Sequence, residues 1–240
     1  DMEQNLSKKT RTESDLIGSR EVPESALYGV QTLRGIENFR ISKFHLNEYP
    51  LFIQALAITK MGAAVANREL DLLTEEQTDA ILKACKEILE GKHHDQFPVD
   101  MIQGGAGPTP NMNANEVIAN RALELMGHAR GEYHYCSPND HVNRSQSTND
   151  AYPTAIHIGL YYTHLKLVKH FATLIEAFRK KGAEFAHIIK MGRTQLEDAV
   201  PMTLGQTFNG FASILEHELK NLDFAAQDFL TVNMGATAIG

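Results

Sequence analysis

Cysteine is scarce in this sequence. Of its 240 residues only Cys85 and Cys136 are cysteines, and they lie far apart with no CxxC arrangement. A small fold stapled by disulfides needs several paired cysteines, so the sequence excludes that class of protein. We expect two free thiols and a protein of a reducing compartment, the cytoplasm.

Long apolar runs are missing as well. A membrane-spanning helix needs about 18 or more consecutive apolar residues, and the sequence has no such stretch. The opening residues, DMEQNLSKKTRTESDLIG, are polar and contain no apolar segment of the kind found in a signal peptide. These absences predict that the protein has no membrane partner, and they again favour the cytoplasm.

Positive charge is in deficit. The chain has 23 lysine and arginine residues against 30 aspartate and glutamate residues, which gives a formal net charge of −7 at pH 7. Nucleic-acid binding depends on basic side chains that neutralise phosphates, and no basic stripe is present here. We therefore predict no nucleic-acid partner.

Nucleotide and metal motifs are also lacking. The segment GGAGPTP at 104–110 is not GxGxxG, because its last position is Pro110, and no strand-like segment precedes it. No GK[ST] motif occurs. Four residues of metal-ligand types lie close together, but their spacing matches no closed zinc pattern: His134, Cys136, Asp140 and His141. We expect no metal site and no cofactor, and leave activation by a divalent cation open.

Helical periodicity is what the sequence has in abundance. Apolar residues between Leu51 and Leu70 approximate one helical face, and Thr74 with Gln77 forms a capping box for a second helix that stops near Gly91. A third helix is expected after the asparagines of NMNANE, with Asn113 as one candidate for its N-cap. Residues 1–50 are rich in turn formers and predict loops and short elements. Strand signals are weak throughout.

Two long helices are predicted in the second half. Pro153 opens an unbroken run to about Ile189, and another run starts near Met202. Apolar residues at steps of three and four over 204–229 make a seam for packing against other helices. We predict a mainly α fold: a mostly helical N-terminal domain over 1–150, followed over 151–240 by the first long helices of a central helical bundle.

Three polar segments interrupt this helical pattern: 104–113, SQSTND at 145–150 and GRTQLED at 192–198. Each is predicted to lie beside a helix end, where unpaired N–H groups and the helix dipole attract anions. Glycines 104, 105 and 107 would allow a positive φ or a close approach to a ligand. Ordinary helix capping explains each segment equally well when it is taken alone. Their recurrence favours a site for a small anionic ligand.

Several segments taken together resemble the aspartase/fumarase superfamily. They are DQFPVDMIQGGAG, NMNANEVIANRALELMG, SPNDHVN, SQSTNDAYPTAI, KMGRTQLEDAVPMTLGQ and VNMGATAIG. The resemblance runs in order over nearly the whole chain, covers roughly the first half of a family member, and is closest to the family's ammonia-lyases.

The resemblance implies a reaction and a set of roles. The reaction is the reversible anti elimination of ammonia from L-aspartate, which gives fumarate through an aci-carboxylate. Ser147 and Thr148 would hold the β-carboxylate, Asn149 would contact the amino group, and Thr194 would bind the α-carboxylate. Asn139 and Asp140 match a segment that forms a secondary anion site in fumarases.

The resemblance also implies an assembly and an incomplete site. Family members are homotetramers whose active sites combine loops from three subunits. The loop that supplies the family's serine base is expected beyond Gly240, so we expect no catalytic residue within these 240 residues and no lyase activity from them alone.

One position, Pro108, departs from the family pattern, and another, Gln195, favours an aspartase over a fumarase. Pro108 stands where the family has a threonine that contacts substrate, and Thr109 is the neighbouring hydroxyl that would have to replace it. Gln195 stands where fumarases and some aspartases have histidine, and glutamine donates and accepts hydrogen bonds but does not titrate.

Two other functions remain open. The first is that of fumarase or another lyase of succinyl-type substrates, such as argininosuccinate lyase. The second is a non-catalytic helical module that oligomerises through the seam at 204–229.

Overall fold

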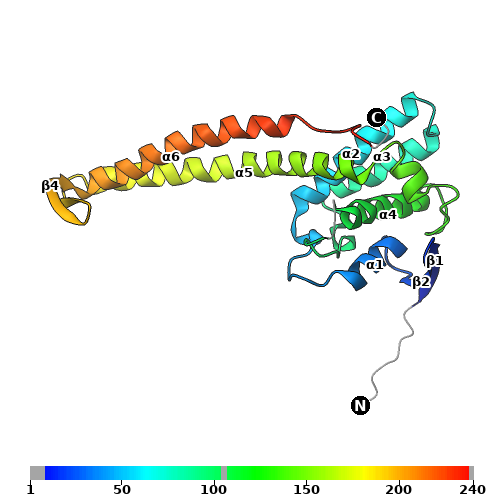
Figure 1. The fold of residues 1–240 in the computed structure, drawn as a ribbon. Coiled ribbons are helices and arrows are strands. Elements are labelled where there is room, and N and C mark those ends of the chain that lie inside the picture. Colours follow the sequence, from blue (N-terminus) through cyan, green and yellow to red (C-terminus); the bar gives the residue numbers. More distant parts are fainter. Residues whose placement is uncertain (1–8, 104–106, 238–240) are drawn as a thin grey trace, which may run out of the picture. The chain divides into compact units, whose positions relative to one another are not determined.

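The fold is mainly helical, as predicted (Figure 1). In this computed structural model, the structure describes residues 9–103 and 107–237. The chain divides into two compact units: Asp1–Gly159 with Val232–Gly240, and Leu160–Thr231.

The first unit opens with a β-hairpin and a short helix. Strand β1 (Thr10–Asp15) pairs antiparallel with β2 (Gly18–Pro23), and helix α1 spans Val30–Asn38. Within the two strands only Glu13 and Val22 are buried. The hairpin was missed by the sequence prediction because its strands carry no alternating row of apolar residues.

Three helices build the core of the first unit. Helices α2 (Pro50–Glu69), α3 (Glu75–Leu89) and α4 (Pro108–Leu125) pack in succession, α2 on α3 and α3 on α4. Their buried side chains include Leu56, Ile81, Cys85, Ile88, Val117, Ile118 and Leu123. The short 3-10 helices η1 (Leu46–Glu48) and η2 (His94–Gln96) lie in the connections.

The structure confirms the first two predicted helices and corrects the third. The predicted capping box of Thr74 and Gln77 begins α3. Helix α4, by contrast, begins at Pro108 and not after the asparagines, with Gly107 as its N-cap. Prolines at the first and third helical positions are tolerated because no helical bond needs their N–H there. The asparagines are therefore buried inside the helix.

The last helices begin where the polar loop of the first unit ends. A π-helical turn, η3 (Pro138–Val142), precedes helix α5 (Thr148–Glu184). Helix α5 starts five residues before Pro153, the predicted start, and ends before Ile189. The division between the two units falls within this helix.

The second unit is a helical pair closed by a hairpin (Figure 1). Strands β3 (Ile189–Thr194) and β4 (Glu197–Thr203) pair antiparallel between α5 and α6 (Leu204–Ala226), and the 3-10 helix η4 (Gln227–Leu230) follows. Thr203 and Gln206 form a capping box at the start of α6. Phenylalanine rings of the two helices pack against each other, and the ring centroids of Phe178 and Phe208 are 6.0 Å apart.

The GRTQLED segment was predicted to lie beside a helix end. That prediction is wrong, because the segment forms the tip of the β3–β4 hairpin. Thr194 pairs with Glu197, so Gln195 and Leu196 are the two loop residues. Both have positive φ, 52° and 68°. Two positive φ values in a two-residue loop match the twist of paired strands, and this turn normally carries asparagine or glycine. The absence of those residues hid it from the sequence prediction.

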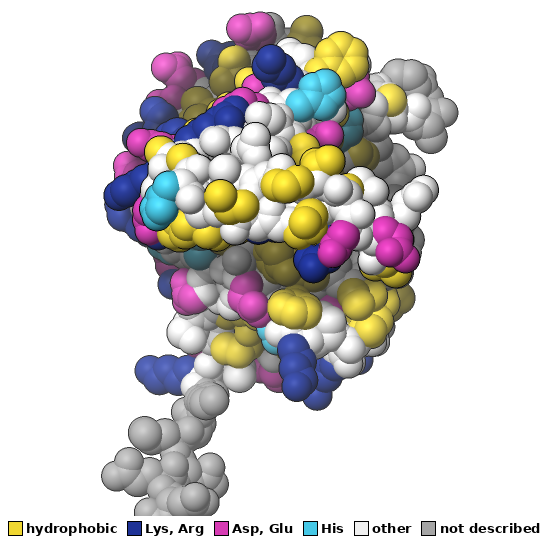
Figure 2. Space-filling view, turned by 90° about the vertical axis from the view of Figure 1, so that its left-hand side faces the viewer, with side chains coloured by type: hydrophobic (Ala, Val, Ile, Leu, Met, Phe, Trp, Pro, Cys, Tyr) yellow, Lys and Arg dark blue, Asp and Glu magenta, His cyan; other side chains and the backbone are white. Residues whose placement is uncertain are grey.

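Hydrophobic side chains are widely exposed. The second unit contributes many of them, among them Leu160, Leu165, Leu174, Phe211, Ile214 and Phe224, and yellow side chains gather on the face drawn in Figure 2. None of the described helices is both long enough and apolar enough to cross a bilayer.

Candidate functional site

The predicted residues Ser147, Thr148 and Asn149 lie together where α5 begins. The Ser147 hydroxyl accepts a hydrogen bond from the Asn149 N–H at 3.2 Å. The Ser147 N–H donates to Asp150 Oδ1 at 2.9 Å. Ser147 and Asp150 thus each accept an N–H at the start of the helix, and the two bonds fix the loop on α5. The Asp150 side chain is fully buried, whereas Asn149 is exposed.

Lys60 of α2 binds the segment that leads into α5. Its side chain is fully buried, and its ammonium group donates to three amide oxygens, Asn111 Oδ1 at 2.7 Å and Asn143 Oδ1 and Gln146 Oε1 at 2.9 Å each. Asn111 belongs to α4, and the other two residues belong to the segment that leads into α5. One cation therefore joins two helices to the candidate loop.

The charge state of Lys60 follows from these contacts. Burial lowers the pKa of Lys60 to about 7, and the nearby charge of Asp150 acts in the opposite direction. The ammonium form has three N–H donors for three oxygens, whereas a neutral amine has only two and would turn its lone pair toward an acceptor. The geometry therefore matches the protonated form.

The Lys60 cluster also orients Thr148. Because Asn111 Oδ1 faces the ammonium group, its Nδ2 is left to donate to Thr148 Oγ1 at 3.3 Å. With an N–H already donated to this oxygen, the Thr148 hydroxyl proton is directed elsewhere. The half-buried hydroxyl can therefore donate to an acceptor at the start of α5.

Sequence reasoning missed Lys60, although a signal was present. Lys60 lies four residues after Leu56 and four before Ala64, on the apolar face of the helix. A charged residue on a buried face is retained only with partners. Two further bonds of the cluster lie within the loop itself: Asn143 Nδ2 donates to the Gln146 carbonyl, and Gln146 Nε2 donates to the Val142 carbonyl.

The glycine-proline turn before α4 is only partly described. Gly107 has a φ of 82°, and a Cβ at this position would lie 2.4 Å from the Tyr152 ring, so both backbone and packing require glycine here. Gly104 and Gly105 lie outside the described residues. Pro108 is exposed, and the methyl group of Thr109 packs against Gly35 of α1.

Thr194 and Gln195 lie in the second unit, at the tip of the β3–β4 hairpin, where both are exposed. The positive φ of Gln195 and Leu196 is unusual for residues with side chains and marks the turn as a position of backbone strain.

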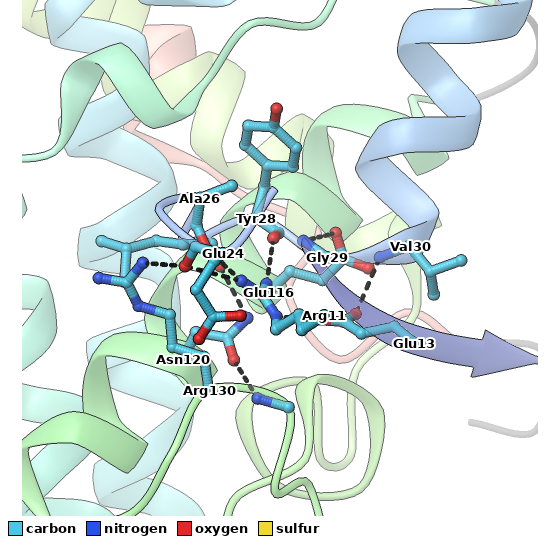
Figure 3. A network of polar contacts seen from close by, with 12 residues as sticks. Arg11, Glu13, Glu24, Ala26, Tyr28, Gly29, Val30, Glu116, Asn120 and Arg130 are labelled. Carbon is cyan, nitrogen blue, oxygen red and sulfur yellow. Dashed lines mark hydrogen bonds and ion pairs between the residues drawn. The ribbon is translucent and has the colours of Figure 1, made fainter. Parts of the chain in front are cut away.

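A second polar network surrounds the N-terminus of α1 (Figure 3). Glu116 of α4 accepts hydrogen bonds from the N–H groups of Gly29, Gln31 and Thr32 and from the Thr32 hydroxyl, at 2.6–3.0 Å. Burial raises the pKa of Glu116 to about 7, and its hydrogen bonds oppose the rise. Next to it, Glu13 accepts the Val30 N–H. The two carboxylates thus accept the N–H groups at the start of α1, and these groups are not available to a ligand.

Asn139 and Asp140 lie in η3 and are exposed. Asn139 lines a cavity of about 620 Å³ together with Asp15, Glu116 and Tyr133. Two carboxylates in the lining do not favour an anion there. The Asp140 N–H is bound to the Ser137 hydroxyl at 3.1 Å.

The start of α5 has the chemistry of a carboxylate site. Its first turn carries two hydroxyls and one exposed amide at the positive end of the helix dipole, above a buried ammonium group. Such donors bind a carboxylate without a metal ion, and they stabilise negative charge that develops on it.

Comparison with known proteins finds relatives among the lyases. The model of the lyase family matches residues 18–240. An aspartate ammonia-lyase from Pseudomonas fluorescens is 57% identical over 231 residues, which are 96% of this chain and 48% of that protein. The chain spans about half the length of the curated relatives it matches.

Solved structures agree with the fold. The fumarate lyase:delta crystallin of Brucella melitensis is 50% identical with a TM-score of 0.92, over 96% of this chain and 54% of that one. The class II fumarase of Schistosoma mansoni is 35% identical with a TM-score of 0.86, over 97% of this chain and 49% of that one. With a family match over most of its length and a closely similar fold, the chain belongs to the lyase family.

Proposed function

We propose that the intact protein is an aspartate ammonia-lyase, which eliminates ammonia from L-aspartate to give fumarate. The observation that carries this proposal is the donor-rich first turn of α5, in a chain 57% identical to an aspartate ammonia-lyase. The resemblance seen in the sequence and the geometry of Ser147–Asn149 support the same substrate class, a small dicarboxylate.

The proposed roles follow the chemistry of the elimination. Ser147 and Thr148 hold the β-carboxylate, and Asn149 contacts the amino group. When a base removes the Cβ proton, the electrons enter the β-carboxylate, and donors already directed at it stabilise the aci-carboxylate. The base is a serine outside these 240 residues.

The remaining substrate contacts are proposed for Thr194, Gln195 and Thr109. Thr194 binds the α-carboxylate, Gln195 donates a hydrogen bond without transferring a proton, and Thr109 supplies a hydroxyl beside Pro108. The exposure of Thr194 and Gln195 at the hairpin tip supports these roles, because both side chains are accessible to a ligand.

A homotetramer is the proposed assembly, located in the cytoplasm. The exposed hydrophobic side chains of α5 and α6 support this, because such surfaces are usually covered by a partner. Both cysteines are free and buried, which suits a reducing compartment. Light scattering of the intact protein measures the assembly directly. No cofactor is part of this proposal.

The test is to supply the intact protein in turn with L-aspartate, malate and argininosuccinate and to follow the absorbance of the unsaturated product. Product from L-aspartate alone supports the proposal. Product from malate would instead assign a fumarase. Inactivity with all three would favour the non-catalytic helical module.

A matched pair of variants links the activity to the site. Thr148→Val removes the hydroxyl and keeps the shape, and we expect kcat/KM for L-aspartate to fall about a hundredfold, as for loss of one aimed donor. Thr173→Val is the control, because Thr173 is exposed on α5 and its hydroxyl bonds only to the Lys169 carbonyl of its own helix.

A further inference from the structure

The residues after the second unit return to the first unit. Val232–Gly240 belongs to the same compact unit as the start of α5. Within this segment a turn is closed by a bond from the Ala236 N–H to the Asn233 carbonyl at 3.0 Å. We call residues 232–237 the return segment. It contacts the two residues that follow Thr148.

The first contact compensates for a proline. Pro153 lies inside α5, and since proline has no N–H, it cannot donate to the Asn149 carbonyl four residues earlier. Asn233 Nδ2 donates to this same carbonyl at 2.9 Å. A side chain 84 residues away in the sequence therefore supplies the hydrogen bond that the helix lacks.

The second contact closes the cap of α5. Asp150 Oδ1 accepts the Ser147 N–H, and Asp150 Oδ2 accepts the Gly235 N–H at 2.8 Å. Gly235 has a φ of 91°, a conformation that side chains rarely adopt, although a Cβ there would meet open space. The requirement for glycine thus comes from the backbone that turns this N–H onto Asp150. One buried carboxylate ties the candidate loop to the return segment.

We propose that Asn233 and Gly235 are positioning residues for the substrate site: they hold the first turn of α5 in the geometry in which Thr148 and Asn149 meet substrate. This inference rests on the proposed function. Asn233 acts through the backbone of Asn149 and does not touch the substrate itself. Its contribution depends on Pro153, because a residue with an N–H at 153 would close the helical bond without help.

The dependence of Asn233 on Pro153 predicts the behaviour of two single variants and their combination. In the intact protein, Asn233→Ala removes the donor, and we expect KM for L-aspartate to rise about three- to tenfold, the range that one net hydrogen bond supplies. Pro153→Ala alone should change KM less than about twofold, since it adds an N–H where Asn233 already donates. In the double variant, the restored helical bond should recover most of the loss.

A matched control separates this effect from loss of any asparagine. Asn221 is exposed on α6, and its amide donates within its own helix to Glu218 at 3.3 Å. Asn221→Ala should leave KM unchanged. An unchanged KM in Asn233→Ala, or a loss that Pro153→Ala does not relieve, would overturn the proposal.

Hydrogen exchange tests the same contact without catalysis. The peptide spanning 145–157 should exchange faster in Asn233→Ala than in the unchanged protein, and the double variant should restore protection. If the unchanged protein does not turn over L-aspartate, the proposed function fails, and exchange alone decides whether the return segment holds α5. Equal exchange in all variants would refute the positioning role even in an active enzyme.

Discussion

At the scale of single residues, the buried ammonium of Lys60 is the group on which the candidate site depends most. An unpaired buried charge is costly, and so are buried acceptors left without donors. Here the cation and the acceptors are paired with each other, because three amide oxygens surround the Lys60 ammonium group. Removing the cation leaves the Asn111 and Gln146 oxygens without this donor, and removing the oxygens leaves a buried charge unpaired.

Lys60→Met keeps the length of the side chain and removes its charge. We expect the free energy of unfolding to fall by about 2–5 kcal/mol, because the buried Asn111 oxygen and the half-buried Gln146 oxygen lose their donor. Urea denaturation followed by helical circular dichroism measures the change. Lys83→Met is the control on exposed α3 surface, and an equal shift in both variants would contradict the special role of Lys60.

Pro108 is a second residue with a measurable consequence. Pro108→Thr adds a hydroxyl at the first position of α4, where the family pattern has one, and we expect kcat/KM for L-aspartate to rise about tenfold, as for one hydrogen bond to a charged group. Pro108→Ala restores the N–H without the hydroxyl and separates the two contributions. Equal kcat/KM in Pro108→Thr and the unchanged protein would show that no donor is missing.

Single residues were predictable where a local pattern carries the information. The capping box at Thr74 depends on a residue three positions on, and the loop at 145–150 could be found from its dense hydroxyl and amide side chains. Lys60, Asn111 and Asn143 meet only through packing of α2, α4 and the loop before α5. No local pattern encodes that meeting, so the cluster had to come from the structure.

At the scale of elements, α3 and α4 are joined by an ion pair as well as by apolar packing. Glu87 of α3 accepts two hydrogen bonds from Arg121 of α4, at 2.6 and 2.8 Å, and one from His93 at 2.7 Å. The Arg121 hydrogen bonds lower the pKa of Glu87 to about 2, against the effect of burial. The carboxylate is thus stabilised by folding.

Glu87→Gln tests this joint and its pH dependence. A folded-state pKa of about 2, below the ordinary 4.5, means that the stabilisation is complete above pH 4.5 and is lost as the pH falls toward 2. We expect the variant to be less stable by about 1–3 kcal/mol at pH 7, because the pair is only partly exposed. Between pH 5 and pH 3 the difference in free energy of unfolding between the variant and the unchanged protein should become smaller.

The exposed Glu76→Gln in the first turn of α3 is the control. Denaturant titrations at several pH values provide the measurement. A difference that stays constant from pH 7 to pH 3 would mean that Glu87 carries no coupled proton.

Helices were the predictable elements, and their starts and the hairpins were not. The apolar face of α2, and the capping box and Gly91 that bound α3, predicted their limits within a few residues. Pro108 and Pro153 misled the prediction of two helix starts, because proline fits the first turn of α4 and is tolerated within α5 beside Asn233. The hairpin at 189–203 has a turn without glycine, so its positive φ values had no sequence signal.

At the scale of the whole molecule, the chain forms one unit from two separate stretches of sequence. The first unit holds residues up to Gly159 and again from Val232, with the entire second unit between them. Sequence patterns gave the order of helices but no sign of this return, since Asn233 and Gly235 look like ordinary turn residues. The resemblance to a known family supplied the substrate class that no pattern of periodicity contains.

The return segment also sets an order of events during synthesis. Asn149 leaves the ribosome 84 residues before Asn233, a delay of roughly 4–17 s at translation rates of about 5–20 residues per second. Throughout that interval the nascent chain can fold α2, α3 and α4 around Lys60, while the Asn149 carbonyl still lacks its donor. The first turn of α5 is thus completed only after both α5 and α6 have been translated.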